Sequence, residues 1–271
     1  MSITKQSILN DLANNQLPLP TLPEVALQVR ETVDDEDATI HDVTEIIETD
    51  AALSARIIQV ANSALYHGLS TAANVHSAVT RMGLLTVRNL ATSLVMKQLF
   101  QATNPVVDKY LRQTWKLSTD VAALTSLLAK SYTRLDPDSA LLAGLTHSIG
   151  VSPILVKAES DPALLNNTEK LDRLINELYP VVGAAILQSW DFAEEMVQVP
   201  AEHLDLDRES DGDVDYCDVV QVALIETVRG TRHPLGHVDP VTADAYERLG
   251  MDVVEEIDMS GGVEEVREAI A

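Results

Sequence analysis

The feature that most constrains this chain is its helical periodicity. Within residues 107–130, Leu117, Val121, Leu124 and Leu128 recur every three or four residues, which places them on one face of a helix. Similar patterns recur along the chain, whereas the strict alternation typical of a half-buried strand is scarce. The sequence therefore predicts an all-α fold, a bundle of many helices.

Caps, glycine and proline place several helix boundaries. Thr39 and Asp50 are predicted N-caps, because their side chains can accept hydrogen bonds from the first amides of a helix. The proline-rich segment 17–23 is predicted to be extended. Gly150 is predicted to end a helix, with Pro153 after it. Predicted helices cover residues 107–130, 139–149, 179–190, 193–203, 215–229 and 241–270.

The chain is strongly acidic, and the charge is unevenly spread. It has 271 residues, with 19 Lys and Arg against 42 Asp and Glu, a formal net charge of −23. Residues 191–271 alone hold 22 acidic and 5 basic residues. Such a surface repels phosphate backbones, so we expect no nucleic-acid binding. The final third either keeps the protein in solution or forms a face for a basic partner.

Composition also indicates the cellular compartment in which the protein is expected. Hydrophobic residues make up 46% of the chain, enough for a sizeable core. There is no run of about 18 consecutive apolar residues, and the first residues lack the apolar core of a secretory signal. The one cysteine, Cys217, excludes an internal disulfide and a multi-cysteine metal site. We therefore expect a cytoplasmic protein that does not enter a membrane.

Three motifs follow one another between residues 16 and 100. They read LPTLPEVALQV, IIETDAALSARIIQVANSALY and AVTRMGLLTVRNLATS. In this order they resemble the signature of the HDOD family, bacterial signalling modules related to the HD phosphohydrolases. The resemblance extends over roughly residues 15–205. It implies an HD-domain-like helical bundle with an N-terminal helical subdomain packed against it.

The resemblance also divides the chain into parts. It implies an N-terminal helix at 1–14, an HDOD-like domain at 15–205 and an acidic C-terminal extension at 206–271. The domain consists of a first half (residues 15–103) and an HD-like second half (residues 104–205). We expect the extension to be helical and to pack on or complete the second half. We also expect the two halves to share one core, because the first half carries more apolar surface than so small a unit easily hides.

Metal chemistry is the first activity that an HD resemblance implies. HD hydrolases hold one or two metal ions with scattered histidines and aspartates, and the metal supplies hydroxide near neutral pH. When that pattern is carried across by position, only His147 and His203 match it. The substituted positions are Leu117, Ser148, Tyr179, Glu202 and Leu224. Two imidazoles without the aspartates make a poor hydrolase centre, so we expect no catalytic residue, no bound metal and no cofactor.

Some of these residues could still contact a ligand. If the family's pocket persists, His147 and His203 would line it, although a buried histidine is more often bonded to a backbone carbonyl. Arg81 and Arg88 flank Gly83 and could bind a small anionic ligand. The alternative for both arginines is ion pairing at the surface.

One acidic segment resembles the calcium loop of an EF-hand, with Gly212 at the turn position. Its candidate ligands are Asp207, Glu209, Asp211, Asp213, Asp215 and Asp218. Glu209 is long for a tight loop, and Asp218 replaces the glutamate that binds calcium through two oxygens. We expect a calcium-free, extended loop, because the acids repel one another.

The function that the sequence favours is a non-catalytic signalling or regulatory module. It would act through an unidentified signalling partner or a small ligand. Two alternatives stay open: a metal-dependent phosphohydrolase of the HD superfamily, and an acidic interaction protein that binds a basic partner. Metal content separates the first two, and salt-dependent capture of basic proteins tests the third.

Overall fold

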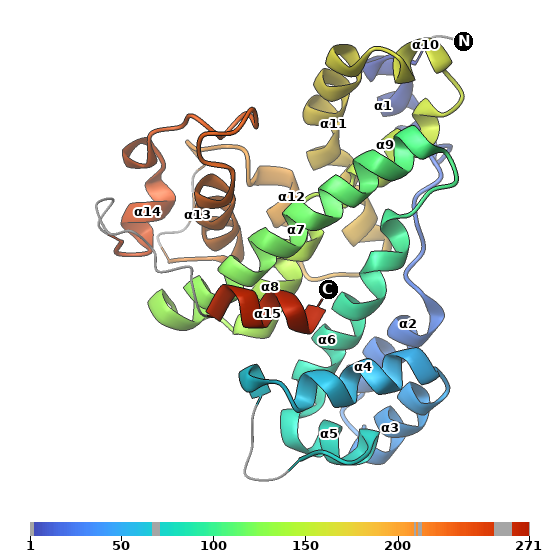
Figure 1. Cartoon of the computed structure of the whole chain (residues 1–271), viewed down its shortest axis with the longest axis vertical. Helices are drawn as coiled ribbons and strands as arrows, with labels where there is room; N and C mark the ends of the chain where they lie inside the picture. Colours follow the sequence, from blue (N-terminus) through green and yellow to red (C-terminus); the bar gives the residue numbers. More distant parts are fainter. Residues whose placement is uncertain (1–2, 67–70, 209, 211–212, 252–261, 271) are drawn as a thin grey trace.

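The structure is a computed structural model that describes residues 3–66, 71–208, 210, 213–251 and 262–270 (Figure 1). Within these residues the regular elements are helices and no strand occurs, which confirms the all-α prediction. After α1 (Lys5–Ala13), the first half contains α2 (Glu24–Val33), α3 (Ile40–Glu48), α4 (Ala51–Ala61), η1 (Ala64–Tyr66), α5 (Val75–Met82), α6 (Leu84–Met96) and η2 (Lys97–Phe100). The second half contains α7 (Pro105–Tyr132), α8 (Pro137–Thr146), α9 (Val151–Ala158), α10 (Pro162–Leu165), α11 (Thr168–Ser189) and α12 (Glu194–Glu202). The extension contains α13 (Tyr216–Val228), η3 (Pro240–Thr242), α14 (Asp244–Arg248) and α15 (Gly262–Ile270).

The predicted caps are where the sequence placed them. The Thr39 hydroxyl accepts a hydrogen bond from the backbone amide of Asp42, whose carboxylate accepts one from the amide of Thr39. This capping box starts α3. Asp50 starts α4 by accepting from the amides of Ala52 and Leu53. Residues 17–23 are not helical, as predicted.

The long helix α7 runs through the middle of the molecule, and the shorter α8 packs against it (Figure 1). The two helices can approach closely because α8 carries Gly144. A Cβ atom at this position would lie 2.4 Å from the Cα atom of Ala122. On the predicted stripe of α7, Val121, Leu124 and Leu128 are buried, whereas Leu117 is half-buried and borders a cavity.

Three predicted boundaries were wrong. The helix predicted at 139–149 ends at Thr146. The helix predicted at 241–270 is interrupted: α14 ends at Arg248, and Gly250 has a φ of +66°, which a continuing helix does not allow. The helix predicted from residue 179 begins earlier, at Thr168.

The buried side chains form two apolar clusters. The larger one joins helices of the first half to α7, α8, α9 and α11 of the second half and also includes side chains of α1 and α15. The smaller one lies between α7, α8 and α12 on one side and α13 and α14 on the other. The first half, the second half and the extension are therefore connected by continuous apolar packing in the part of the chain that is described.

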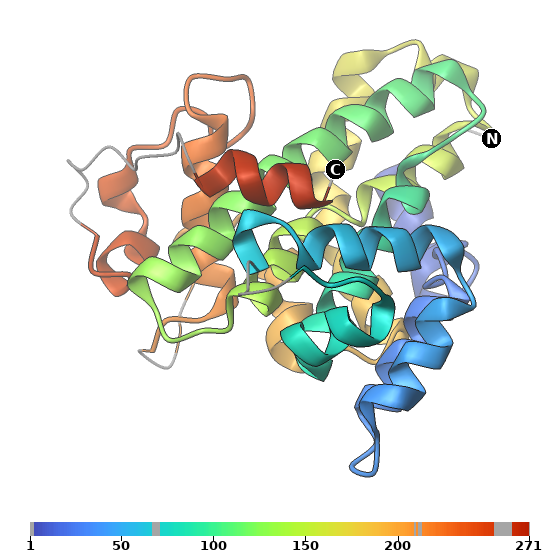
Figure 2. The same ribbon diagram turned by 60° about the horizontal axis from the view of Figure 1, so that its bottom comes forward.

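The two terminal helices pack against helices that are distant from them in sequence. α1 packs beside α10 and α11 of the second half (Figure 1). There Lys5 pairs with Glu177, and Asp11 pairs with Lys157. α15 lies across α7 and also contacts α4 of the first half, an arrangement visible in both views (Figure 2).

One stretch, Pro137–Ala158, is long and apolar enough for a membrane span by length and composition alone. In the structure it forms two helices, α8 and α9, and 89% of its most apolar window is buried inside the protein. This is the environment of core helices.

Candidate functional site

A cavity of about 310 Å³ opens between α7, the turn after α8, and α11. A loop that follows α13 closes one side of it. The cavity gathers several polar groups on a partly apolar wall, a combination typical of small-molecule sites. Its lining includes Tyr110, Gln113, Thr114, Leu117, His147, Ser148, Asp172, Asn176, Tyr179, Arg232 and His233.

His147 lies at the end of α8 with its ring almost completely buried. Its Nδ1 is 2.6 Å from the carbonyl oxygen of Gly144, so this nitrogen carries the proton and donates. Burial lowers the pKa of His147 to about 4, although the bond to Gly144 opposes the shift. The imidazole is therefore neutral at pH 7. In the described part of the chain its Nε2 has no hydrogen-bond partner, so this lone pair is available to a ligand.

His203 lies behind His147 and is fully buried. The Tyr179 hydroxyl donates to its Nε2 over 2.7 Å, and its Nδ1 donates to the Val199 carbonyl over 2.9 Å. The rings of His147 and His203 meet edge to face, with centroids 5.3 Å apart. Burial, followed by the neighbouring His147, lowers the pKa of His203 to about 3. Because both ring nitrogens are engaged, His203 has no lone pair left for a metal.

Some of the other positions taken from the HD pattern line the cavity, and the rest lie elsewhere in the protein. Ser148 shares a 2.5 Å hydrogen bond with Ser118, and Leu117 contributes aliphatic wall. Leu224 is fully buried in the smaller apolar cluster. Glu202 is in contact with Arg208 instead of the cavity.

These residues do not fit a metal ion. No group of three or more His, Cys, Asp or Glu side chains within the described ranges is arranged to hold one. The cavity lining holds His147, His233 and Asp172, but these side chains do not form a set of three that converges on one point. No chemical step through a metal can be derived from this geometry.

Sequence reasoning missed part of the cavity. Arg232 and His233 come from the loop after α13, and burial lowers the pKa of His233 to about 4. Tyr110 donates to Asp172 over 3.0 Å across the opposite wall. Burial and this carboxylate raise the pKa of Tyr110 to about 12. None of these residues carries a local sequence signal, because their proximity depends on how distant helices pack.

The two arginines that we singled out do not share this cavity. Arg81 donates to the carbonyl of Ala61 over 2.7 Å and stabilises the end of α4. Arg88 pairs with Asp34 over 2.6 Å and borders a different pocket. The predicted set of two histidines and two arginines is thus spread over separate places.

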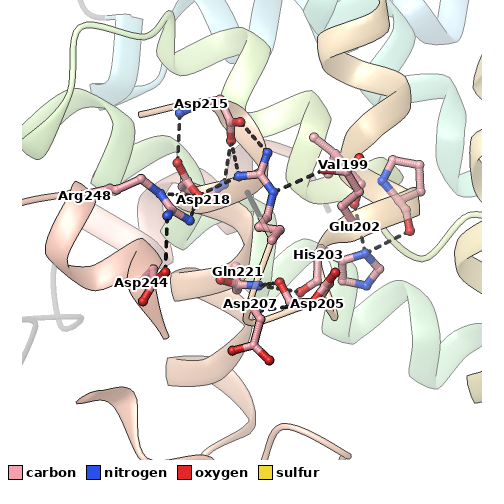
Figure 3. Close-up of polar contacts among 12 residues, drawn as sticks. Val199, Glu202, His203, Asp205, Asp207, Asp215, Asp218, Gln221, Asp244 and Arg248 are labelled. Carbon is pink, nitrogen blue, oxygen red and sulfur yellow. Dashed lines mark hydrogen bonds and ion pairs between the residues drawn. The ribbon is translucent and has the colours of Figure 1, made fainter. Parts of the chain in front are cut away.

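The acidic segment that resembles a calcium loop contains an arginine, Arg208, that pairs with carboxylates of the same segment. Figure 3 shows two of these carboxylates, Asp215 and Asp218, close to Arg248. Arg208 is buried and pairs with Asp215 at 2.5 Å and with Asp218 at 2.7 Å. Arg248 of α14 also pairs with Asp218 at 2.7 Å. Asp215 and Asp218 form the capping box of α13 as well.

These contacts correct the repulsion argument, because two of the six acids are neutralised by arginine. Asp207 and Asp213 are exposed. Glu209 and Asp211 lie outside the described residues. The absence of calcium binding stays a prediction.

The sequence and the structure were compared with known proteins. The sequence model of the HDOD domain matches residues 19–206. A solved structure from Shewanella amazonensis, provisionally named a metal-dependent phosphohydrolase, is 35% identical and covers 98% of each chain with a TM-score of 0.85. A solved structure from Marinobacter aquaeolei, provisionally named a signal transduction protein, is 21% identical with a TM-score of 0.64. It covers 98% of this chain and 64% of that one.

Among curated proteins, one uncharacterised protein of Treponema pallidum is 25% identical over 202 residues. The match takes in 69% of this chain but only 38% of the relative. The chain therefore spans little more than a third of that longer protein.

Proposed function

The chain belongs to the HDOD domain family, and on this basis we propose that it is a non-catalytic, cytoplasmic module of bacterial signal transduction. In this proposal a small ligand binds in the cavity beside His147 and biases the packing between the halves. A partner protein then reads the resulting change. Two findings support a regulatory role: the family match covers most of the chain, and the neighbour from Marinobacter aquaeolei is named for signal transduction.

One observation supports the proposal: the cavity is lined by positions that the HD pattern assigns to metal ligands, and most of these positions carry other groups. Leu117, Ser148 and Tyr179 line the cavity in place of metal-binding groups. Both ring nitrogens of His203 already form hydrogen bonds, one with the Tyr179 hydroxyl and one with the Val199 carbonyl. A cavity of this size without a set of metal ligands supports binding without turnover.

The cavity also indicates the chemistry of its ligand. The Nε2 of His147 is an acceptor, since Nδ1 carries the proton. The Asp172 carboxylate and the Arg232 guanidinium both lie on the wall, so the cavity offers charges of both signs. A small polar molecule with a hydrogen-bond donor near His147 fits these groups. In this proposal, binding changes how often the two halves adopt each of two arrangements. The ligand must therefore bind one arrangement of the halves better than the other.

A metal-dependent phosphohydrolase is the second candidate, and the provisional name of the Shewanella amazonensis relative favours it. The decisive experiment supplies the full chain with Mn²⁺, Mg²⁺, Fe²⁺ or Ni²⁺ and a chromogenic phosphodiester or phosphomonoester. We expect no turnover above the metal-only blank. Turnover that disappears in His147→Ala but persists in His76→Ala, a change at an exposed histidine, would establish the hydrolase and overturn our proposal.

A further inference from the structure

A second pocket, of about 360 Å³, lies where the two halves of the domain meet. Its walls come from α2 and α6 of the first half, and from α8 and the start of α12 of the second half. It shares no lining residue with the cavity beside His147. A ligand bound there would contact none of the residues that line the cavity beside His147.

Two arginines meet in this pocket. The guanidinium carbon of Arg30 lies 3.7 Å from the centre of the Phe192 ring, and its Nη2 donates to the carbonyl of Asp191 over 3.3 Å. The Nη1 of Arg88 donates to Asp34 over 2.6 Å. The Nε of Arg88 is buried and has no hydrogen-bond partner among the described residues. A buried donor without a partner is destabilising, and an oxyanion would satisfy it.

Arg30 makes no ion pair among the described residues, so its charge has no direct carboxylate partner in the pocket. Burial first, and then the charge of Arg88, lower the pKa of Arg30, although the nearby Asp34 and Asp191 act in the opposite direction. Asp34 is half-exposed and already bonded to Arg88, so it neutralises only part of the pair. Two guanidinium groups held near each other in this way are stabilised by an anion that contacts both.

The start of α12 adds a third favourable feature. Ala193 is the N-cap of this helix, and it makes no side-chain cap hydrogen bond. Ala193, Glu195 and Met196 border the pocket, so the amides of the first turn begin there. An uncapped helix N-terminus attracts anions through its free amides and its dipole. Three carboxylates of the lining oppose this attraction, those of Asp34, Asp191 and Glu195.

We propose that this pocket binds a small oxyanion, a phosphate or carboxylate group held between Arg30 and Arg88 at the N-terminus of α12. Arg88 offers its Nε and Nη2 edge, because Nη1 is occupied by Asp34, and this edge suits a bidentate contact. Since α2 and α6 belong to one half and α12 to the other, the anion would bridge the two halves of the domain.

The test is calorimetric titration of the full chain with inorganic phosphate, adenosine monophosphate and citrate at neutral pH. We expect saturable one-site binding of at least one probe. Arg30→Met and Arg88→Met should each weaken it roughly tenfold to hundredfold, the effect of losing a charge-assisted hydrogen bond. Arg112→Met removes the same charge from an exposed position on α7 and should leave the affinity unchanged. Binding of phosphate and adenosine monophosphate but not citrate assigns a phosphate ligand, and the reverse assigns a carboxylate.

Two further variants keep the test decisive if the arginine variants do not fold. Arg88→Lys keeps the charge but loses the bidentate edge, so it should bind more weakly than the wild type. Glu195→Gln removes a negative charge beside the anion and should bind more tightly. Failure of all three probes to bind, or affinities that do not respond to these substitutions, would overturn the proposal. Neither result depends on the cavity beside His147.

Discussion

At the scale of single residues, the protein keeps three imidazoles uncharged by removing His147 and His203 fully, and His233 in part, from water. His147, His203 and His233 lie close to one another, and a proton on any of them would be poorly solvated. This arrangement connects proton uptake to unfolding, since the unfolded chain exposes the same rings to water.

The first prediction is that the protein loses stability as the pH falls from 6.5 toward 4. An unfolded histidine takes up a proton near pH 6.5, whereas His147 and His203 in the folded state have pKa values of about 4 and 3. The unfolded state therefore binds more protons in this window, and the free energy of unfolding decreases with falling pH. Above pH 6.5 this contribution is complete. Urea unfolding at pH 7.5, 6.5 and 5.5 measures the slope.

The control for this prediction compares a substitution at a buried histidine with one at an exposed histidine. His203→Gln removes one buried imidazole and should flatten the pH dependence. His76→Gln changes an exposed histidine and should leave the slope as in the wild type. Equal slopes in the two variants would contradict the assignment to the buried rings.

The second prediction concerns the carboxylate that joins Arg208 to Arg248. Asp218 is fully buried and accepts from both arginines. Asp218→Ala leaves two largely buried cations short of their partner and should lower the free energy of unfolding by about 3–5 kcal/mol. Asp213→Ala removes an exposed acid of the same segment and should change it by less than about 0.5 kcal/mol. A shift of the urea midpoint that is the same for both variants would show that the ion cluster does not stabilise the fold.

At the scale of elements, α7 and α8 pack closely, and their contact depends on the missing side chain of Gly144. The third prediction is that Gly144→Ala destabilises the protein by about 1–3 kcal/mol or more, because the new methyl group meets the α7 backbone at Ala122. Thermal unfolding and near-ultraviolet circular dichroism would report the loss. Gly262→Ala adds the same methyl group where it meets only the flexible end of Leu127, and it should be tolerated. A tolerated Gly144→Ala would mean that α7 and α8 can separate freely.

The elements that could be predicted from sequence are those with local signals. Thr39 and Asp50 start helices through their own side chains. Gly150 shows where such reasoning fails: it is predicted to end a helix, but α8 ends at Thr146 and Gly150 is the N-cap of α9. Pro153 lies in the first turn of α9, where no intrahelical donor is needed. The helix at 241–270 failed because its apolar spacing continues past Gly250, and the positive φ of that glycine is not encoded in the spacing.

Only those residues of the candidate site that belong to a sequence motif could be predicted from the sequence. His147 and Tyr179 were located through the family resemblance, and the structure brings both to one cavity. His233 was not predicted, because it lies in a loop of the C-terminal extension that no motif connects with the cavity. Arg30 and Arg88 are separated by 58 positions of sequence numbering and meet only because α2 packs on α6. Contacts of this kind depend on tertiary packing, which no local motif records.

At the scale of the whole molecule, the two halves are tied together by apolar and polar contacts. The larger apolar cluster runs through both. Asp138 at the start of α8 accepts hydrogen bonds from Tyr66 and Thr86 of the first half. Asn89 of α6 donates to Ser139 over 3.0 Å. Burial raises the pKa of Asp138, so this carboxyl depends on its partners across the boundary.

The last prediction is that residues 1–103 and 104–271 do not fold as independent monomers. Division at this point separates α1 from α11 and α15 from α4, and it opens the apolar cluster between the halves. Each large side chain exposed in this way forfeits roughly 1.5–3 kcal/mol of burial. Circular dichroism and urea unfolding of each fragment should show no cooperative transition, whereas mixing the fragments should restore one. If both fragments unfold cooperatively as monomers, the halves are separate domains, and a ligand could not transmit a change from one to the other through a shared core.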